Sequence, residues 1–357
     1  MGKIEKNRKS VDGIDEKIAE LLGKRLKLAE EIGKEKKQVH EPVYDPVREE
    51  EIIEKLSAKS GGKLSRKAIE PIFREIFSLS RKAQQPLKVA FLGPETSFTH
   101  SAAIKQFGTQ TGFVSADSIN EVFAITEKGE ADFGVVPIEN SLEGSVNHTY
   151  DMFMGSGLNI VAEVSLEISH NLLSKYRLRD VKKLYTNPVA LAQCKEWVSK
   201  NLPKAEVLEV SSTAKSAESA SLYIDSAAIA SRLAAKKYGL NILAENIQDS
   251  AKNLTRFLVI GKARPKKSAK SKTSLMFSTR HKPGALFDAL QALKSNSINM
   301  TKIESRPNKQ RNWEYVFFVD VQGFAEDESL KKALAEMRKH TIFLSVLGSY
   351  PEKASFE

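Results

Sequence analysis

Residues 253–261 read NLTRFLVIG, and this stretch decides the fold class of the middle of the chain. Its apolar residues, Leu254 and then Phe257 to Ile260, predict a strand buried in a core. Thr255 and Arg256 interrupt the apolar run in its first half. A buried hydroxyl or guanidinium group needs a hydrogen-bond or charge partner. Either neighbouring groups of the protein supply these partners, or a ligand binds there.

Three segments of different character surround this strand. Residues 87–263 alternate short apolar runs with amphipathic stretches, which predicts an α/β domain. Residues 1–86 have a helical pattern, and residues 273–357 have a strand-helix-strand-strand-helix-strand order that favours a ferredoxin-like α+β sandwich. The basic run between them, within residues 264–272, has no apolar side chain larger than those of Pro265 and Ala269 and is interpreted as a linker. We therefore predict a multidomain protein.

Composition narrows the class of protein and its compartment. The chain has 357 residues, 41% of them hydrophobic and 28% charged, as in soluble globular proteins. There is no apolar run of membrane-spanning length and no apolar core of a signal peptide, and the lone Cys194 suits a reducing cytoplasm. One cysteine and six scattered histidines predict no metal site. The formal charge of +10 suits acidic metabolites, because no basic stripe with interleaved aromatics points to nucleic acid.

The first predicted helix, from about Ile4 to Lys37, carries cations on its apolar face. Arg25 lies at the centre of the apolar stripe, and Lys36, eleven residues on, shares that face. Arg8 precedes Arg25 by seventeen residues and is rotated away by roughly 100°. A site that uses all three cations would therefore need a second chain. The alternative is an antiparallel bundle whose cations pair with its many glutamates on solvated faces.

Two further helices are expected before residue 86. Asp45 is a good N-cap and Pro46 suits the first helical position, so Arg48 and Glu49 fall in the opening turn of the second helix. The third helix follows Ser65 and runs to about Gln84.

The stretch IDEKIAELLGKRLKLAEEIGKEK (14–36) and these charged residues resemble the all-helical chorismate mutase family over residues 5–85. The resemblance implies an interlocked dimer in which one arginine reaches the partner's pocket, in agreement with the position of Arg8. Rearranging the dicarboxylate chorismate to prephenate needs a folded substrate and stabilised charge, but no nucleophile and no metal. The resemblance implies that Arg8 and Arg25 bind the carboxylates of the substrate and that Arg48 assists nearby. It implies that Lys36 and Gln84 donate hydrogen bonds to the ether oxygen and that Glu49 accepts one from the ring hydroxyl. Asp45 would orient the start of the second helix.

Polar clusters recur along the central segment, in GPETSFTHSAA (93–103), VPIENSLEGSV (136–146), ISHNLL (168–173), NPVALAQC (187–194) and EVSSTAKSAE (209–218). Each by itself is typical of a turn or a helix cap. Together with NLTRF, and in this order, they resemble prephenate dehydratase from about residue 87 to 261. The chain departs from that family at Thr96, where glycine is usual, and at Asn187, where histidine is common.

This second resemblance implies two α/β lobes with the active site in the cleft between them. Prephenate loses a hydroxyl and a carboxylate, and Thr255 would be the acid or hydrogen-bond donor that assists departure of the hydroxyl. The candidates for binding the substrate are Ser97, Thr99, Asn140, Ser141, His170, Gln193, Thr213 and Arg256. Strand alternation places Thr255 and Arg256 on opposite faces, so Arg256 either binds a carboxylate from an adjoining loop or locks the strand.

The stretches GALF (284–287) and ESRP (304–307) of the last segment resemble the ACT domains of prephenate dehydratases, over roughly residues 273–350. In those domains phenylalanine binds between two protomers. The resemblance implies feedback inhibition by phenylalanine at Gly284, Ala285, Leu286, Glu304, Ser305 and Arg306.

The sequence therefore predicts a cytoplasmic, cofactor-free member of the bifunctional chorismate mutase–prephenate dehydratase family, working as a homodimer or a dimer of dimers. Two alternatives stay open. In the first, the helical domain has lost its activity and only dimerises beside a working dehydratase. In the second, the chain is an amino-acid-binding sensor without catalysis. The set from Arg8 to Gln84 argues against the first, and Thr255 argues against the second.

Overall fold

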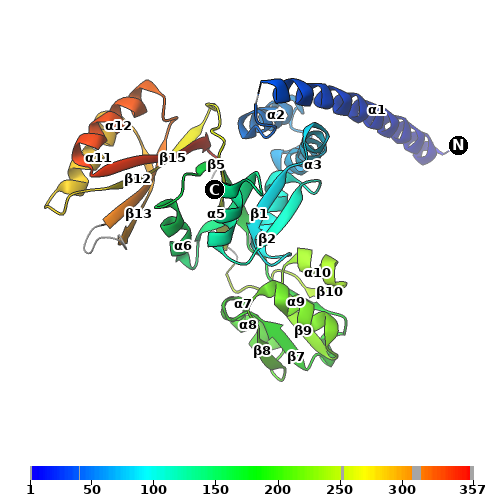
Figure 1. Cartoon of the computed structure of the whole chain (residues 1–357). Coiled ribbons are helices and arrows are strands. Elements are labelled where there is room, and N and C mark those ends of the chain that lie inside the picture. Colours follow the sequence, from blue (N-terminus) through cyan, green and yellow to red (C-terminus); the bar gives the residue numbers. More distant parts are fainter. Residues whose placement is uncertain (1, 40, 251–252, 308–314, 354–357) are drawn as a thin grey trace. The chain divides into compact units, whose positions relative to one another are not determined.

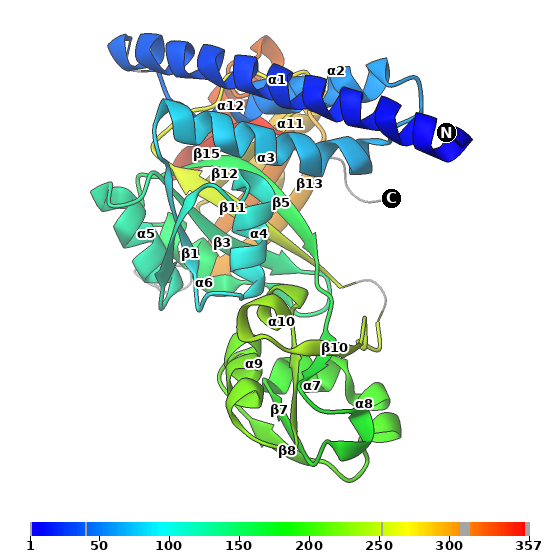
Figure 2. The same ribbon diagram turned by 90° about the vertical axis from the view of Figure 1, so that its right-hand side faces the viewer.

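A computed structural model describes residues 2–39, 41–250, 253–307 and 315–353. The chain forms two compact units, Met1–Lys88 with Ile104–Gly112 and Val89–Ala103 with Phe113–Glu357. Figures 1 and 2 show their secondary structure. None of the helices in the described part of the chain has the length and apolar content needed to cross a membrane.

The first unit contains the three predicted helices, α1 (Lys3–Gln38), α2 (Pro46–Lys59) and α3 (Arg66–Gln84). Asp45 caps α2 as predicted, because its carboxylate accepts a hydrogen bond of 3.0 Å from the Arg48 backbone N–H. Helices α1 and α3 approach so closely that a Cβ atom added at Gly33 would lie 2.8 Å from Gln84. Residues 104–112, which include the end of α4 (Phe98–Phe107), complete this unit.

The predicted strand NLTRFLVIG forms β11 (Leu254–Gly261), which is hydrogen-bonded on both sides within a sheet of order β2-β1-β3-β11-β5. The other elements of this lobe are β1 (Lys88–Leu92), β2 (Gly112–Ala116), β3 (Phe133–Asn140), β4 (Gly144–Ser145), β5 (Asn159–Glu167), α5 (Ile119–Lys128) and α6 (Asn147–Phe153). Strand β11 runs antiparallel to β3, with Thr255 opposite Asn140 and Arg256 opposite Glu139. This register places two neighbouring pairs of polar residues on opposite faces of one sheet.

A second lobe is inserted between β5 and β11. Its sheet has the order β10-β6-β9-β7-β8. The strands are β6 (Asn171–Ser174), β7 (Lys183–Thr186), β8 (Glu206–Glu209), β9 (Ser226–Ala230) and β10 (Asn241–Ala244). The helices are α7 (Pro188–Gln193), α8 (Lys195–Asn201), α9 (Thr213–Leu222), α10 (Arg232–Tyr238) and the 3-10 turn Leu178–Asp180. The predicted two-lobed α/β arrangement is confirmed.

The last part of the chain forms the predicted ferredoxin-like sandwich. Its sheet has the order β13-β14-β12-β15, and α11 and α12 cover one face (Figure 1). The bounds are β12 (Ser271–Ser278), α11 (Ala285–Ser295), β13 (Met300–Pro307), β14 (Tyr315–Gln322), α12 (Glu328–His340) and β15 (Phe343–Pro351). Strand β12 begins at Ser271, so it includes the last two residues of the predicted linker.

The other face of this last sheet packs against the first lobe. Met276, Phe318 and Leu347 share one buried apolar cluster with Ile138 and Leu258. Strands β15 and β5 approach so closely that a Cβ atom at Gly348 would lie 2.2 Å from the backbone oxygen of Ile160. The strand that carries Thr255 is therefore buried between the cleft side and the last sheet.

Candidate active sites

The helical unit contains a pocket of about 470 Å³ built by all three helices. Six of the predicted residues line it, namely Arg25, Lys36, Asp45, Arg48, Glu49 and Gln84. Arg8 does not line this pocket and is exposed on α1. The structure therefore brings together the predicted residues of one chain, except the arginine that the sequence assigned to a partner.

Two cations of this pocket, Arg25 and Lys36, are held in place by contacts with other groups of the helical unit. Arg25 donates a hydrogen bond to Ser80 and lies over the Phe77 ring, with its guanidinium carbon 5.6 Å from the ring centre. Burial lowers the pKa of Arg25, while Glu49 acts in the opposite direction. The Lys36 ammonium donates to the Pro42 carbonyl at 2.9 Å. These contacts aim positive charge into the pocket, where a dicarboxylate would neutralise it.

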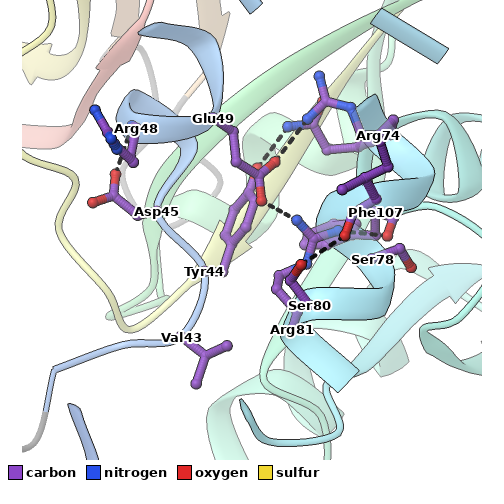
Figure 3. A network of polar contacts seen from close by, with 12 residues as sticks. Val43, Tyr44, Asp45, Arg48, Glu49, Arg74, Ser78, Ser80, Arg81 and Phe107 are labelled. Atoms are coloured by element: carbon purple, nitrogen blue, oxygen red, sulfur yellow. Dashed lines mark hydrogen bonds and ion pairs between the residues drawn. The ribbon is translucent and has the colours of Figure 1, made fainter. Parts of the chain in front are cut away.

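Glu49 is held by two arginines that sequence reasoning missed. Its carboxylate accepts hydrogen bonds from Arg74, at 2.9 Å, and from Arg81 (Figure 3). Both arginines belong to α3 and are buried. A signal for them exists in the sequence: they are seven residues apart and share a helix face with Phe77. Pairing with Glu49 explains why such charges are tolerated in the interior.

The two α/β lobes enclose a cleft of about 380 Å³. Six predicted residues line it, namely Thr99, Asn140, His170, Gln193, Thr213 and Thr255. Ser97 and Ser141 are not among the lining residues, because their hydroxyls bond the backbone: Ser97 donates to Leu92 at 2.9 Å, and Ser141 accepts from Leu254 at 3.0 Å. The structure does not bring these two serines into the cleft.

A chain of amide side chains fixes Thr255 at the cleft. The Asn140 side-chain N–H group donates to Thr255 Oγ1 at 2.7 Å and to Asn253 Oδ1 at 2.8 Å. Asn253 in turn donates to Gln193 Oε1 at 2.9 Å. Because Asn140 acts as the donor to the threonine oxygen, the Thr255 hydroxyl proton can point to a ligand. Sequence reasoning missed Asn253, although it stands two residues before Thr255 and so shares its face of the strand.

His170 lines the cleft as a neutral group. Its Nε2 atom lies 2.9 Å from Gln193 Oε1. Burial lowers the pKa of His170, and the hydrogen bond with Gln193 opposes that shift without reversing it. Above pH 7 the imidazole is therefore uncharged and serves to orient Gln193. Glu143 also lines the cleft and accepts from the Gln193 amide at 3.2 Å.

The guanidinium group of Arg256, in the strand NLTRFLVIG, finds its charge partners within the protein. It points away from the cleft and pairs with Glu163 at 2.9 Å, Asp320 at 2.6 Å and Glu139 at 3.2 Å. Its charge is thus satisfied by carboxylates of the protein on the face opposite to Thr255. Arg256 does not line the cleft, and of its two predicted roles these contacts favour locking the strand.

A third pocket, of about 230 Å³, lies at the start of α11 and includes Gly284, Ala285 and Leu286. The predicted residues of β13 do not line it. Glu304 accepts a hydrogen bond of 2.7 Å from Ser145, and Arg306 lies 3.5 Å from the Asp151 carboxylate. The exposed Ser305 pairs across the sheet with Phe317, a residue that lines the pocket.

Comparison with known proteins finds the same three parts in the same order. Sequence models match for chorismate mutase type II at residues 7–85, prephenate dehydratase at 89–265 and the ACT domain at 273–338. The chain is 46% identical over 357 residues to the bifunctional chorismate mutase/prephenate dehydratase of Aquifex aeolicus, covering 99% of each chain. It is 39% identical to that of Stutzerimonas stutzeri, covering 97% of this chain and 96% of the relative.

Among solved structures, the prephenate dehydratase of Arthrobacter aurescens in complex with L-Phe superposes with a TM-score of 0.69. The two are 35% identical, and the match covers 74% of this chain and 90% of that one.

Proposed function

The chain belongs to the bifunctional chorismate mutase/prephenate dehydratase family, and on this basis we propose how its residues carry out the two reactions. It is an enzyme with a mutase domain, a dehydratase domain and an ACT regulatory domain. The mutase converts chorismate to prephenate, and the dehydratase converts prephenate to phenylpyruvate in phenylalanine biosynthesis. The observation that carries the proposal is the convergence of the predicted residues in two separate pockets.

In the helical pocket, Arg25 binds a carboxylate of chorismate and Arg48 assists nearby. The rearrangement breaks a carbon–oxygen bond while a carbon–carbon bond forms, and no proton is transferred. Lys36 and Gln84 donate hydrogen bonds to the ether oxygen, which gains negative charge as its bond breaks. Glu49 accepts a hydrogen bond from the ring hydroxyl, and so fixes the folded conformation.

The mutase site is completed by a second copy of the chain. Helix α1 exposes apolar side chains along its length, including Ile14 at 56%, Ile18 at 49% and Leu21 at 62%. An apolar stripe of this size favours burial against another helix. In the resulting homodimer Arg8 binds a carboxylate in the partner's pocket. The lone Cys194 and the acidic substrates suit a cytoplasmic enzyme.

In the cleft between the lobes, prephenate is held by neutral donors. Gln193 and Thr213 orient its carboxylates, with Thr99 nearby. Asn140 holds Thr255 and Asn253, to which it donates both of its amide protons. The ring carboxylate leaves as carbon dioxide, and its electron pair makes the ring aromatic as the hydroxyl departs with a proton as water. Thr255 donates a hydrogen bond to that hydroxyl, and the Asn140 amide polarises the threonine oxygen.

Phenylalanine binds the pocket at Gly284, Ala285 and Leu286 and inhibits the dehydratase. The Arthrobacter relative was solved with L-Phe, which supports this effector. The predicted residues Glu304 and Arg306 contact Ser145 and Asp151 of the dehydratase domain. A shift of β13 on phenylalanine binding would therefore act directly on that domain.

The test feeds the purified protein first chorismate and then prephenate, with and without phenylalanine, and follows phenylpyruvate. We expect both substrates to give phenylpyruvate and phenylalanine to suppress it. The Thr255→Ala variant should accumulate prephenate from chorismate, while Thr255→Ser, which keeps the hydroxyl, should retain activity. Consumption of prephenate but not chorismate would mean that the helical domain only dimerises. Consumption of neither would favour the sensor.

A further inference from the structure

Helix α3 carries two buried arginines that are absent from the predicted catalytic set, Arg81, which lines the mutase pocket, and Arg74, which does not. The side chains of Arg74 and Arg81 are about as buried as that of Glu49, with residue exposures of 4%, 3% and 7%. Figure 3 shows both guanidinium groups pointing at the Glu49 carboxylate. Arg74 donates to Oε2 and Arg81 to Oε1, so each carboxylate oxygen has its own donor. This leaves lone pairs on both oxygens for a further donor.

Arg81 is itself anchored from its far side. Its second guanidinium nitrogen donates a hydrogen bond of 2.6 Å to the backbone carbonyl of Phe107. The guanidinium carbon also lies 5.5 Å from the centre of the Tyr44 ring and 6.0 Å from that of Phe107. These contacts leave the group little freedom to rotate. Because Arg81 binds both groups, the position of the Phe107 carbonyl helps to fix the position of the Glu49 carboxylate.

The Phe107 carbonyl comes from the dehydratase part of the sequence, which begins at residue 89. Its contact with the helices is not isolated. Gln106 donates to the Tyr44 hydroxyl at 2.6 Å, and the Gln110 backbone donates to Ser78 at 3.0 Å. A Cβ atom at Gly108, whose φ is +72°, would lie 2.5 Å from the Ser78 side chain. Residues 104–112 therefore fold as part of the helical unit.

We propose that Arg81 is a positioning residue of the chorismate mutase reaction, held in place by the Phe107 carbonyl of the dehydratase sequence. The proposal rests on the proposed role of Glu49 as acceptor of the substrate hydroxyl. A carboxylate held at both oxygens keeps one orientation, and its remaining lone pairs then meet the hydroxyl in the geometry that the reaction requires. Without Arg81, Glu49 keeps a single side-chain hydrogen bond among the described residues, the one from Arg74, and can rotate away.

The test is a double-mutant cycle in the full-length chain, using Arg81→Met and Glu49→Gln. Arg81→Met should lower the mutase kcat/KM by about 10- to 100-fold, the size of loss expected from a misplaced reacting group. Its conversion of prephenate to phenylpyruvate should stay within about twofold of the parent, because the dehydratase cleft is untouched. The double variant should be no slower than Glu49→Gln alone, since Arg81 acts through Glu49.

Two further variants make the result specific. Arg81→Lys keeps the charge and should recover part of the lost mutase activity; it decides the question if Arg81→Met does not fold. Lys82→Met is the matched control, because Lys82 is also on α3 and also binds residues 104–112, donating to the Gln110 side chain at 3.2 Å, but does not line the pocket. It should leave the mutase unchanged.

Multiplicative effects in the double variant, or equal loss of both activities in Arg81→Met, would overturn the proposal. Full mutase activity in a Glu49→Met variant, which has no side-chain oxygen to accept a hydrogen bond, would instead refute the proposed role of Glu49. The two failures are therefore distinguishable.

Discussion

Replacing Arg256 with methionine probes the ion cluster that joins β11 to the ACT sheet. Arg256 contacts Glu139, Glu163 and Asp320, and Lys272 and Lys302 pair with two of these carboxylates. The cluster so defined holds three cations and three anions and is neutral. The variant keeps most of the apolar volume but leaves one uncompensated negative charge among buried groups.

The size of the effect follows from the burial of these side chains. Side-chain exposure is 12% for Arg256, 4% for Glu163 and 10% for Asp320. Breaking a buried pair by removing one partner costs roughly 3–5 kcal/mol. Glu139 is 33% exposed and can recover some hydration, so we expect the low end of that range. A loss of about 3 kcal/mol would lower the Tm by about 6–12 °C in a unit of this size.

The assay is thermal and denaturant unfolding of the full chain, with Arg232→Met as matched control. Arg232 pairs with Glu245 at 2.8 Å, but both side chains are at least half exposed, at 66% and 50%. That variant should lose less than about 1 kcal/mol. Adding Asp320→Asn to Arg256→Met restores neutrality and should recover part of the stability. Equal losses in the two methionine variants, or no recovery in the double variant, would refute this account of the cluster.

Three other changes test the backbone and the cleft. Gly348→Ala should lower the free energy of unfolding by about 1–3 kcal/mol or more, because its Cβ would meet the Ile160 oxygen at 2.2 Å; an unchanged Tm would contradict that contact. Thr96 has a φ of 71°, a left-handed conformation that costs a β-branched residue of order 1–3 kcal/mol, so Thr96→Gly should unfold at the same or a higher temperature; a lower Tm would count against strain there. Burial in the folded chain lowers the pKa of His170 from its ordinary value of about 6.5. As the pH falls below about 6.5, the His170 imidazole is therefore protonated first in the unfolded chain, and the free energy of unfolding should decrease. His170→Gln should flatten that decline in denaturant titrations at pH 7.5 and 5, and an identical decline in both proteins would refute it.

Much of the secondary structure was predictable because its causes are local. Helix α2 begins where Asp45 and Pro46 supply a cap and a preset φ, and the cap bond is formed. The apolar run after Arg256 forms the predicted strand β11, and alternation along it correctly placed Thr255 and Arg256 on opposite faces. These signals act over a few residues, so they can be read without knowledge of the rest of the fold.

The candidate sites were predictable to a lesser degree. Most of the residues chosen by resemblance to the mutase family line one pocket. Thr255 and Asn140, chosen by resemblance to the dehydratase family, line another. Ser97 and Ser141 carry hydroxyl groups, a kind of group that binds carboxylates, yet their hydroxyls bond the backbone. A hydroxyl next to a turn serves either purpose, and only its final orientation separates the two.

The amino-acid sequence is enough to predict the order of the three domains, the helix starts, the strand that carries Thr255 and the family to which the chain belongs. The partners of the buried arginines, in contrast, depend on how the elements pack in three dimensions. Arg256 meets Asp320, which is 64 residues away, and Arg81 meets Glu49 across 32 residues. Such pairs form because two packed elements exclude water around a charge that must then be neutralised. That requirement depends on which surfaces meet in the folded chain, and no local pattern of residues specifies it.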